Sequence, residues 1–183
     1  MNDVRLRVTC PLGAPTGFGQ AAHDTLMAML RAEIEIEIDP ILPPQMNVLE
    51  ERYMELGTLT KHVDDDWPTH YLVHCSPAFA DKLAHDEMAP KLGIPRILYT
   101  TWETHKVPRH LAYKIDAAYH VIVVPSEHNR EAFAAGGIPK EKIRVIPHGV
   151  DPSWWTAKAT MPEHELRGPK PYTFYSILTW CEG

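Results

Sequence analysis

The chain has few of the features that mark secreted, membrane-spanning or zinc-binding proteins. It holds three cysteines, too widely spaced for a disulfide framework or a zinc motif: Cys10, Cys75 and Cys181. This usage indicates a reducing compartment. No apolar run approaches the roughly 20 residues that cross a bilayer, and Met1 is followed at once by polar residues. We therefore expect a cytoplasmic protein, with Cys10 and Cys75 as buried small side chains at strand ends.

Positive charge is also in short supply. Lys and Arg number 18 against 24 Asp and Glu, which gives a net charge of −6, and the basic residues are scattered. Nucleic-acid phosphates normally require a basic patch, so the composition argues against a nucleic-acid partner. The densest charged run is Asp64–Asp66, and no further carboxylate or suitably spaced His completes a ligand set there. We interpret it as a solvated loop and predict no metal site.

Strand-like and helix-like hydrophobic patterns alternate along most of the chain. Because such alternation is typical of parallel sheets with right-handed crossovers, we predict an α/β fold. The expected architecture is a Rossmann-like parallel sheet with helices on both faces. Strands are predicted at 4–10, 33–39, 71–75, 96–100, 120–124 and 143–146, and helices at 20–32, 79–92, 109–119 and 127–135.

Three further features concern the edges of this domain. The segment 33–39 alternates Glu and Ile, which predicts a half-exposed strand at or near a sheet edge. The segment 40–68 is the least legible, with a short helix expected at 46–56. Prolines then punctuate a polar stretch after Asp151. We predict a domain at 1–151, an interdomain linker at 152–171 and the first strand of a second, truncated domain at 172–183.

Polar clusters follow three of the predicted strands, in Tyr99–Thr104, Val121–Arg130 and Ile143–Asp151. Carboxyl ends of parallel strands share one edge of a sheet, where α/β proteins bind ligands. In the first cluster, Glu103 beside Trp102 suits a sugar, since carboxylates accept hydroxyl protons and aromatic rings stack on apolar sugar faces. The alternative is that Trp102 packs beneath the crevice and Glu103 caps the following segment.

The other clusters leave similar alternatives open. Ser126 is a natural N-cap, and capping alone explains it, although Ser126 or Asn129 could also face the cleft. His148 either points toward a ligand or is a hydrogen-bonded structural histidine. Gly149 is expected to adopt a conformation that other residues resist, as a hinge would require. His74 and His23 are weaker candidates, for which we expect ordinary packing or surface exposure.

The glycine-rich stretch Gly17–Gly19 is predicted to form a loop before the first helix. A helix N-terminus offers free N–H groups and a partial positive charge, and glycines let a ligand approach the backbone. A sugar-phosphate or an acceptor hydroxyl could bind there, and the alternative is a plain turn. The spacing from Gly13 to Gly17 to Gly19 does not fit the dinucleotide fingerprint, which argues against NAD.

Taken in order, three motifs resemble the retaining glycosyltransferases of family 4, which have the GT-B fold. These are Thr101–Thr104, Val124–Phe133 and Val145–Asp151, and Phe174–Trp180 looks like the first strand of that family's second domain. The resemblance covers most of the chain from Tyr71 onward, together with Gly17–Gly19.

The resemblance implies two Rossmann-like domains that face each other across a cleft. The first mostly holds the acceptor and the second holds the nucleotide-sugar donor, usually without a bound metal or other cofactor. This chain would be the acceptor-side domain, without the basic pair and paired glutamates of the donor side. Residue patterns and resemblance together assign catalytic roles to Glu103 and His148, and substrate binding to Gly17, Phe18, Gly19, Trp102, Thr104, Ser126 and Asn129.

Two other functions stay open on sequence grounds beside the first, an acceptor side of a transferase that needs a donor domain or a complementing chain. One alternative is half of a sugar-nucleotide epimerase, which shares the architecture. A third possibility is a non-catalytic binding domain, whose exposed interdomain surface would contact a partner or a second copy. In the first case we expect no turnover of a nucleotide sugar by the 183-residue chain alone.

Overall fold

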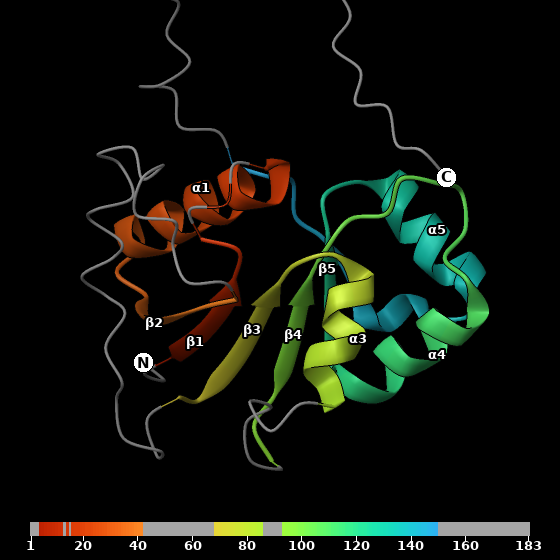
Figure 1. Cartoon of the computed structure of the whole chain (residues 1–183), viewed down its shortest axis with the longest axis horizontal. Helices are drawn as coiled ribbons and strands as arrows, with labels where there is room; N and C mark the ends of the chain where they lie inside the picture. The colour runs from red at the N-terminus through yellow and green to blue at the C-terminus, as the bar shows by residue number, and fades with distance from the viewer. Residues whose placement is uncertain (1–3, 13, 15, 42–67, 86–92, 150–183) are drawn as a thin grey trace, which may run out of the picture. The chain divides into compact units, whose positions relative to one another are not determined.

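A parallel sheet forms the centre of the structure, a computed structural model that describes residues 4–12, 14, 16–41, 68–85 and 93–149. These residues all belong to one unit, Met1–Val150. The six strands are mutually parallel, in the order β2-β1-β3-β4-β5-β6 (Figure 1). They are β1 (Arg5–Cys10), β2 (Glu35–Pro40), β3 (His70–His74), β4 (Arg96–Tyr99), β5 (Val121–Val124) and β6 (Ile143–Val145). The predicted fold is confirmed, with strand ends shifted by one or two residues.

Helices cover both faces of the sheet, as the sequence predicts. Within the described residues they are α1 (Gly17–Arg31), α3 (Pro77–His85), α4 (Arg109–Ala118) and α5 (Glu127–Gly136), with a short 3₁₀ helix, η1 (Lys140–Lys142). Figure 1 shows α3, α4 and α5 grouped together, away from α1. Side chains alternate across each strand, so one face of the sheet packs on α1 and the opposite face packs on the other three helices.

Period-two patterning explains which residues face α1. Leu6 and Val8 of β1 join Ile36 and Ile38 of β2 and Leu26 of α1 in one apolar cluster. Neighbouring strands in register bring these side chains to the same face, where each buried aliphatic side chain contributes about 1.5–3 kcal/mol.

The other face of β1 and β2 is polar. Arg7 Nε donates to Glu37 Oε2 at 2.8 Å, and the hydroxyls of Thr9 and Tyr71 lie 2.6 Å apart. β2 is an edge strand of this sheet, as its alternation predicts. The prediction that its polar face is exposed is wrong at Glu37, which is 6% exposed and pairs with Arg7 of the neighbouring strand.

Helix starts follow the capping chemistry of the sequence. Thr16 caps α1, since its hydroxyl accepts a hydrogen bond from Gly19 N, so Gly17–Gly19 is the first helical turn and not the predicted loop before it. Ser126 caps α5 in the same way, by accepting from Asn129 N. Gly137 ends α5 in the left-handed conformation with φ of 116°, which glycine adopts at no steric cost.

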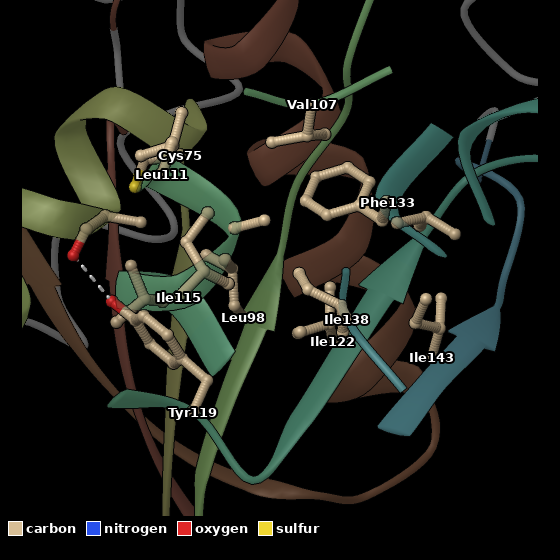
Figure 2. Packing of buried hydrophobic residues seen from close by; sticks show 14 of the residues in the cluster. Cys75, Leu98, Val107, Leu111, Ile115, Tyr119, Ile122, Phe133, Ile138 and Ile143 are labelled. Atoms are coloured by element: carbon tan, nitrogen blue, oxygen red, sulfur yellow. Dashed lines mark hydrogen bonds between the residues drawn. The ribbon is translucent and has the colours of Figure 1, made fainter. Parts of the chain in front are cut away.

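The second apolar cluster fills the space between the sheet and helices α3, α4 and α5. Figure 2 shows Phe133 of α5 and Ile115 of α4 pointing toward Leu98 and Ile122 of the sheet. The hydroxyl of Tyr119 donates to the carbonyl of Ala80 at 3.0 Å, so this buried aromatic residue carries its own polar partner (Figure 2).

Both described cysteines are buried and free, as predicted. Burial raises the pKa of the Cys10 and Cys75 thiols to about 12, so neither is a thiolate at neutral pH. The predicted helix at 46–56, the end of the predicted helix at 86–92, the linker at 152–171, the strand at 172–178 and Cys181 lie outside the described residues.

Candidate functional site

The carboxyl edge of the sheet gathers most of the side chains that the sequence singles out. After β1 the chain passes through α1 to β2, and then returns across β1 to β3, so the strand order reverses between β1 and β3. Ligands of open α/β sheets bind beyond the carboxyl ends of the strands at such a reversal. The first turn of α1 and the segments that follow β3, β4, β5 and β6 all meet at this edge because every strand is parallel.

Asn129 connects the segment after β4 to the start of α5. It is 6% exposed. Its Oδ1 accepts from the backbone N–H of Trp102 and from the hydroxyl of Thr101, and its Nδ2 donates to Ser126 Oγ at 3.2 Å. The structure thus gives both Asn129 and Ser126 intramolecular partners, and they position the Trp102 backbone. Contact of either side chain with a substrate stays a prediction.

Trp102 and Thr104 are joined by a local hydrogen-bond network. Trp102 Nε1 donates to Thr104 Oγ1 at 2.8 Å and to the carbonyl of Lys106 at 2.9 Å. The indole is partly buried against the apolar cluster of α3, α4 and α5, which agrees with the packing alternative for this ring. Its remaining exposure leaves one part of the ring at the surface.

Glu103 between them is exposed. Among the described residues its carboxylate has no hydrogen-bond or ion-pair partner. The alternative that Glu103 caps the following segment finds no support among the described hydrogen bonds, and α4, which begins at Arg109, has no side-chain cap. The carboxylate is therefore available to a ligand at this edge.

The two glycines of the first α1 turn have different surroundings. A Cβ added at Gly19 would lie 2.0 Å from the carbonyl oxygen of Ala14, so Gly19 is required by the close approach of the preceding loop. A Cβ at Gly17 would meet nothing within 4 Å. The plain-turn alternative explains Gly19, whereas Gly17 leaves its backbone open to a ligand.

Three aromatic rings pack together at the centre of the edge, and the sequence did not reveal this group. His74 at the end of β3 stacks on Tyr99 at the end of β4, with ring centroids 4.6 Å apart. His148, which follows β6, lies 5.2 Å from Tyr99 and 6.0 Å from His74, and the planes of the three rings are within 22° of one another. We call these three residues the ring cluster.

The expectation of ordinary packing for His74 misses this arrangement. The side chain is buried, as one of the two alternatives had it, but it also lies against His148 and against the edge of Phe18, whose ring centroid is 6.2 Å away. The sequence does show that His74 and Tyr99 each lie at the end of a strand. Their contact, however, depends on the register of β3 and β4, which places His74 beside Tyr99.

Burial keeps the two imidazoles uncharged. Desolvation, with a smaller contribution from the neighbouring His148, lowers the pKa of His74 from 6.5 to about 4. Desolvation also lowers the pKa of His148. His74 Nε2 and His148 Nδ1 are both buried, without a hydrogen-bond partner in the described part of the chain. A neutral imidazole can donate from one nitrogen and accept at the other, so a ring at this edge can bind a hydroxyl or a phosphate oxygen.

The segment after β6 runs alongside α1. A Cβ added at Gly149 would lie 4.0 Å from the carbonyl oxygen of Asp24, whose carboxylate accepts from Gln20 and contacts the buried His23. The prediction that Gly149 has an unusual conformation is wrong. Among the described glycines, only Gly93 and Gly137 have a positive φ, and Gly149 does not.

Within the described residues, no three His, Cys, Asp or Glu side chains are grouped so that they could hold a metal ion. Over the same part of the chain, every helix is too short or too polar to cross a bilayer.

Comparisons with known proteins agree with this architecture. Residues 39–154 match the family model described as Glycosyltransferase Family 4. The fold is similar to that of the Anabaena protein Alr3699/HepE, solved in complex with UDP and glucose (TM-score 0.53) and in complex with UDP-glucose (TM-score 0.52), each at 10% sequence identity. These matches cover 90% and 89% of this chain but 50% and 49% of the Anabaena chain, so the chain spans about half the length of these structures. None of the curated proteins matches the chain.

Proposed function

The chain belongs to glycosyltransferase family 4, and from this premise we propose that it is the acceptor-side domain of an enzyme that transfers a sugar from a nucleotide sugar to an acceptor. The family match over residues 39–154 carries the proposal. This range includes β3 to β6 and every polar segment that follows them up to Gly149.

A nucleotide-sugar donor is supported by the structural relatives. The Anabaena protein was solved with UDP and glucose and with UDP-glucose. In enzymes of the resembled type, the second domain holds most of the donor and the first mostly holds the acceptor. Activity of this chain therefore requires a donor domain, in the same polypeptide or in a complementing one.

The exposed groups of the carboxyl edge would contact the substrates. Glu103 accepts hydrogen bonds from sugar hydroxyls, and the exposed part of the Trp102 ring packs on an apolar sugar face. The open backbone at Gly17 and Phe18 receives a phosphate or hydroxyl oxygen at the N-terminus of α1. His148 supplies a neutral imidazole beside the reacting sugar. Gly19, Thr104, Ser126 and Asn129 hold these groups in place.

Donor turnover tests this function. The purified chain is incubated with UDP-glucose and a panel of sugar acceptors, with and without a separately produced family-4 donor domain, while UDP release and glycoside formation are measured. We expect glycoside only when both domains and an acceptor are present. Transfer by the chain alone would contradict the proposed division of labour.

The same experiment separates the other two functions. An epimerase half would convert UDP-glucose to another sugar nucleotide without forming a glycoside, and the nucleotide product identifies it. A binding domain would give neither product in the complemented mixture, although it would still bind a sugar or a partner. Either result would replace the transferase proposal.

A further inference from the structure

The orientation of the His148 ring depends on aromatic packing. Within the described residues, His148 Nδ1 is buried without a hydrogen-bond partner, so no polar contact fixes the ring from that side. The rings that it contacts are those of Tyr99 at 5.2 Å and His74 at 6.0 Å. Because Nδ1 is buried while the side chain as a whole is half-buried, Nε2 is the ring nitrogen that a ligand can reach.

The backbone that carries His148 is held separately. The Tyr99 hydroxyl donates to the carbonyl of Ile146 at 2.8 Å, two residues before His148. On the other side, Gly149 lies next to the carbonyl of Asp24 in α1. The Tyr99 hydrogen bond holds the backbone from which the His148 side chain starts, but it leaves rotation about the side chain's own bonds to the packing of the ring.

His74 provides a rigid surface for that packing. It is 1% exposed and lies in register with Tyr99, with the planes of the two rings 18° apart. The planes of His74 and His148 differ by 10°. A side chain at position 74 without a ring would leave a gap beside His148, into which the His148 ring could rotate.

We propose that His74 is a positioning residue, which with Tyr99 holds the His148 ring so that Nε2 is presented at the carboxyl edge to a hydroxyl or phosphate oxygen of the substrate. The proposal rests on the proposed function for the identity of that oxygen. The arrangement of the rings does not depend on it. His74 itself does not touch the substrate, because its side chain is covered by Phe18, Tyr99 and His148.

Among the residues that the structure describes, few titratable groups face the His148 ring, so its titration is a clear reporter. From β3 it faces His74, and from β4 it faces Tyr99. On the α1 side, Asp24 approaches the next residue through its carbonyl, and its carboxylate is engaged by His23 and Gln20. A change in the titration of His148 on mutation of His74 therefore reports the loss of ring packing.

Two variants of the 183-residue chain test the proposal. His74→Ala removes the ring, and His74→Phe keeps an aromatic ring at the same place without its nitrogens. Histidine Cε1–Hε1 signals are followed by NMR from pH 4 to 8, and a His148→Gln variant assigns the His148 signal. Thermal unfolding is recorded for each variant at pH 7.

In the wild-type chain we expect His148 to titrate below 6.5 and its Hε1 signal to be displaced by the neighbouring rings. In His74→Ala the His148 pKa rises toward 6.5 and the displacement is reduced, because the ring gains access to water. In His74→Phe both values remain close to wild type. A merely structural role would lower the melting temperature of His74→Ala while the pKa and the Hε1 position of His148 stay unchanged.

Either of two results would overturn the proposal. One is an unchanged His148 signal in His74→Ala. The other is an equal change in both variants, since ring packing would then not be what holds His148. None of these measurements needs turnover, so a failure of the transferase proposal in the donor assay is distinguishable from a failure of this one.

Discussion

At the scale of single residues, the carboxyl edge separates groups that face a ligand from groups that support them. Glu103 is exposed and unpaired among the described residues, whereas Asn129 uses both ends of its amide within the protein. Both residue types look alike as polar residues after a strand. Their hydrogen-bond partners distinguish them, and the partners of Asn129 Oδ1 lie 27 and 28 positions away in sequence, while only Ser126, the partner of Nδ2, is local. Local pattern alone therefore could not assign them.

The carboxylate of Glu103 should matter for transfer and not for stability. In the complemented enzyme, we expect Glu103→Gln to lower kcat/KM roughly 10-fold to 100-fold, the usual effect of losing hydrogen bonds to a charged group. Glu141→Gln, which changes another exposed carboxylate on η1, should leave kcat/KM unchanged. Urea unfolding should give the same free energy for both variants and wild type. Equal kinetics in the two variants would remove Glu103 from the site.

The glycines at 17 and 19 should respond differently to the same substitution. Gly19→Ala places a methyl group against the Ala14 carbonyl and should lower the free energy of unfolding by about 1–3 kcal/mol. Gly17→Ala meets open space, so stability should change by less than about 0.5 kcal/mol. Urea denaturation measures both. In the donor assay, Gly17→Ala should raise the KM for UDP-glucose, and an unchanged KM would assign Gly17 to the turn alone.

At the scale of whole elements, the sequence predicts what depends on local chemistry. Strand and helix positions follow from periodicity, and the start of α5 follows from the Ser126 hydroxyl. Prediction from the sequence fails where the neighbours of an element decide which of its side chains are buried. The Glu and Ile alternation of β2 correctly indicates an edge strand, but it predicts exposure for Glu37, which is buried and pairs with Arg7 of the neighbouring strand.

Neighbouring glutamates on the same face of β2 should therefore contribute unequally. Glu37→Gln removes the charged partner of the partly buried Arg7 side chain and should lower the free energy of unfolding by about 1–3 kcal/mol. Glu35→Gln changes an exposed carboxylate two positions earlier, and we expect less than about 0.5 kcal/mol. Chemical denaturation of both variants at pH 7 checks the contrast. Similar losses in the two variants would contradict the assigned role of the Arg7–Glu37 pair.

At the scale of the whole molecule, the sheet brings together residues that the sequence keeps apart. The parallel order of strands could be predicted, and with it a shared edge for the polar segments. The ring cluster could not, because it depends on the register of β3 against β4 and on where the chain turns after β6. His148 was predicted as a site residue through its motif, while His74, which has no motif, was a weaker candidate for which ordinary packing or surface exposure was expected.

The buried state of His74 makes the stability of the whole fold depend on pH. Its pKa is lowered from 6.5 in the unfolded chain to about 4 in the folded protein, chiefly by desolvation. Between these two values the unfolded chain binds more protons, so the free energy of unfolding falls as the pH falls from 6.5 to 4. The contribution is fully present above pH 6.5, and its loss amounts to at most about 3 kcal/mol.

Urea unfolding at intervals from pH 7 to pH 4 measures this effect, with His74→Phe as the control. Carboxylates titrate over the lower part of the same range in both proteins, so the difference between the two curves isolates His74. We expect that difference to grow in favour of His74→Phe as the pH falls below 6.5, because phenylalanine has no proton to gain. Parallel curves would mean that His74 is protonated without cost, and would contradict its placement among three packed rings that exclude water.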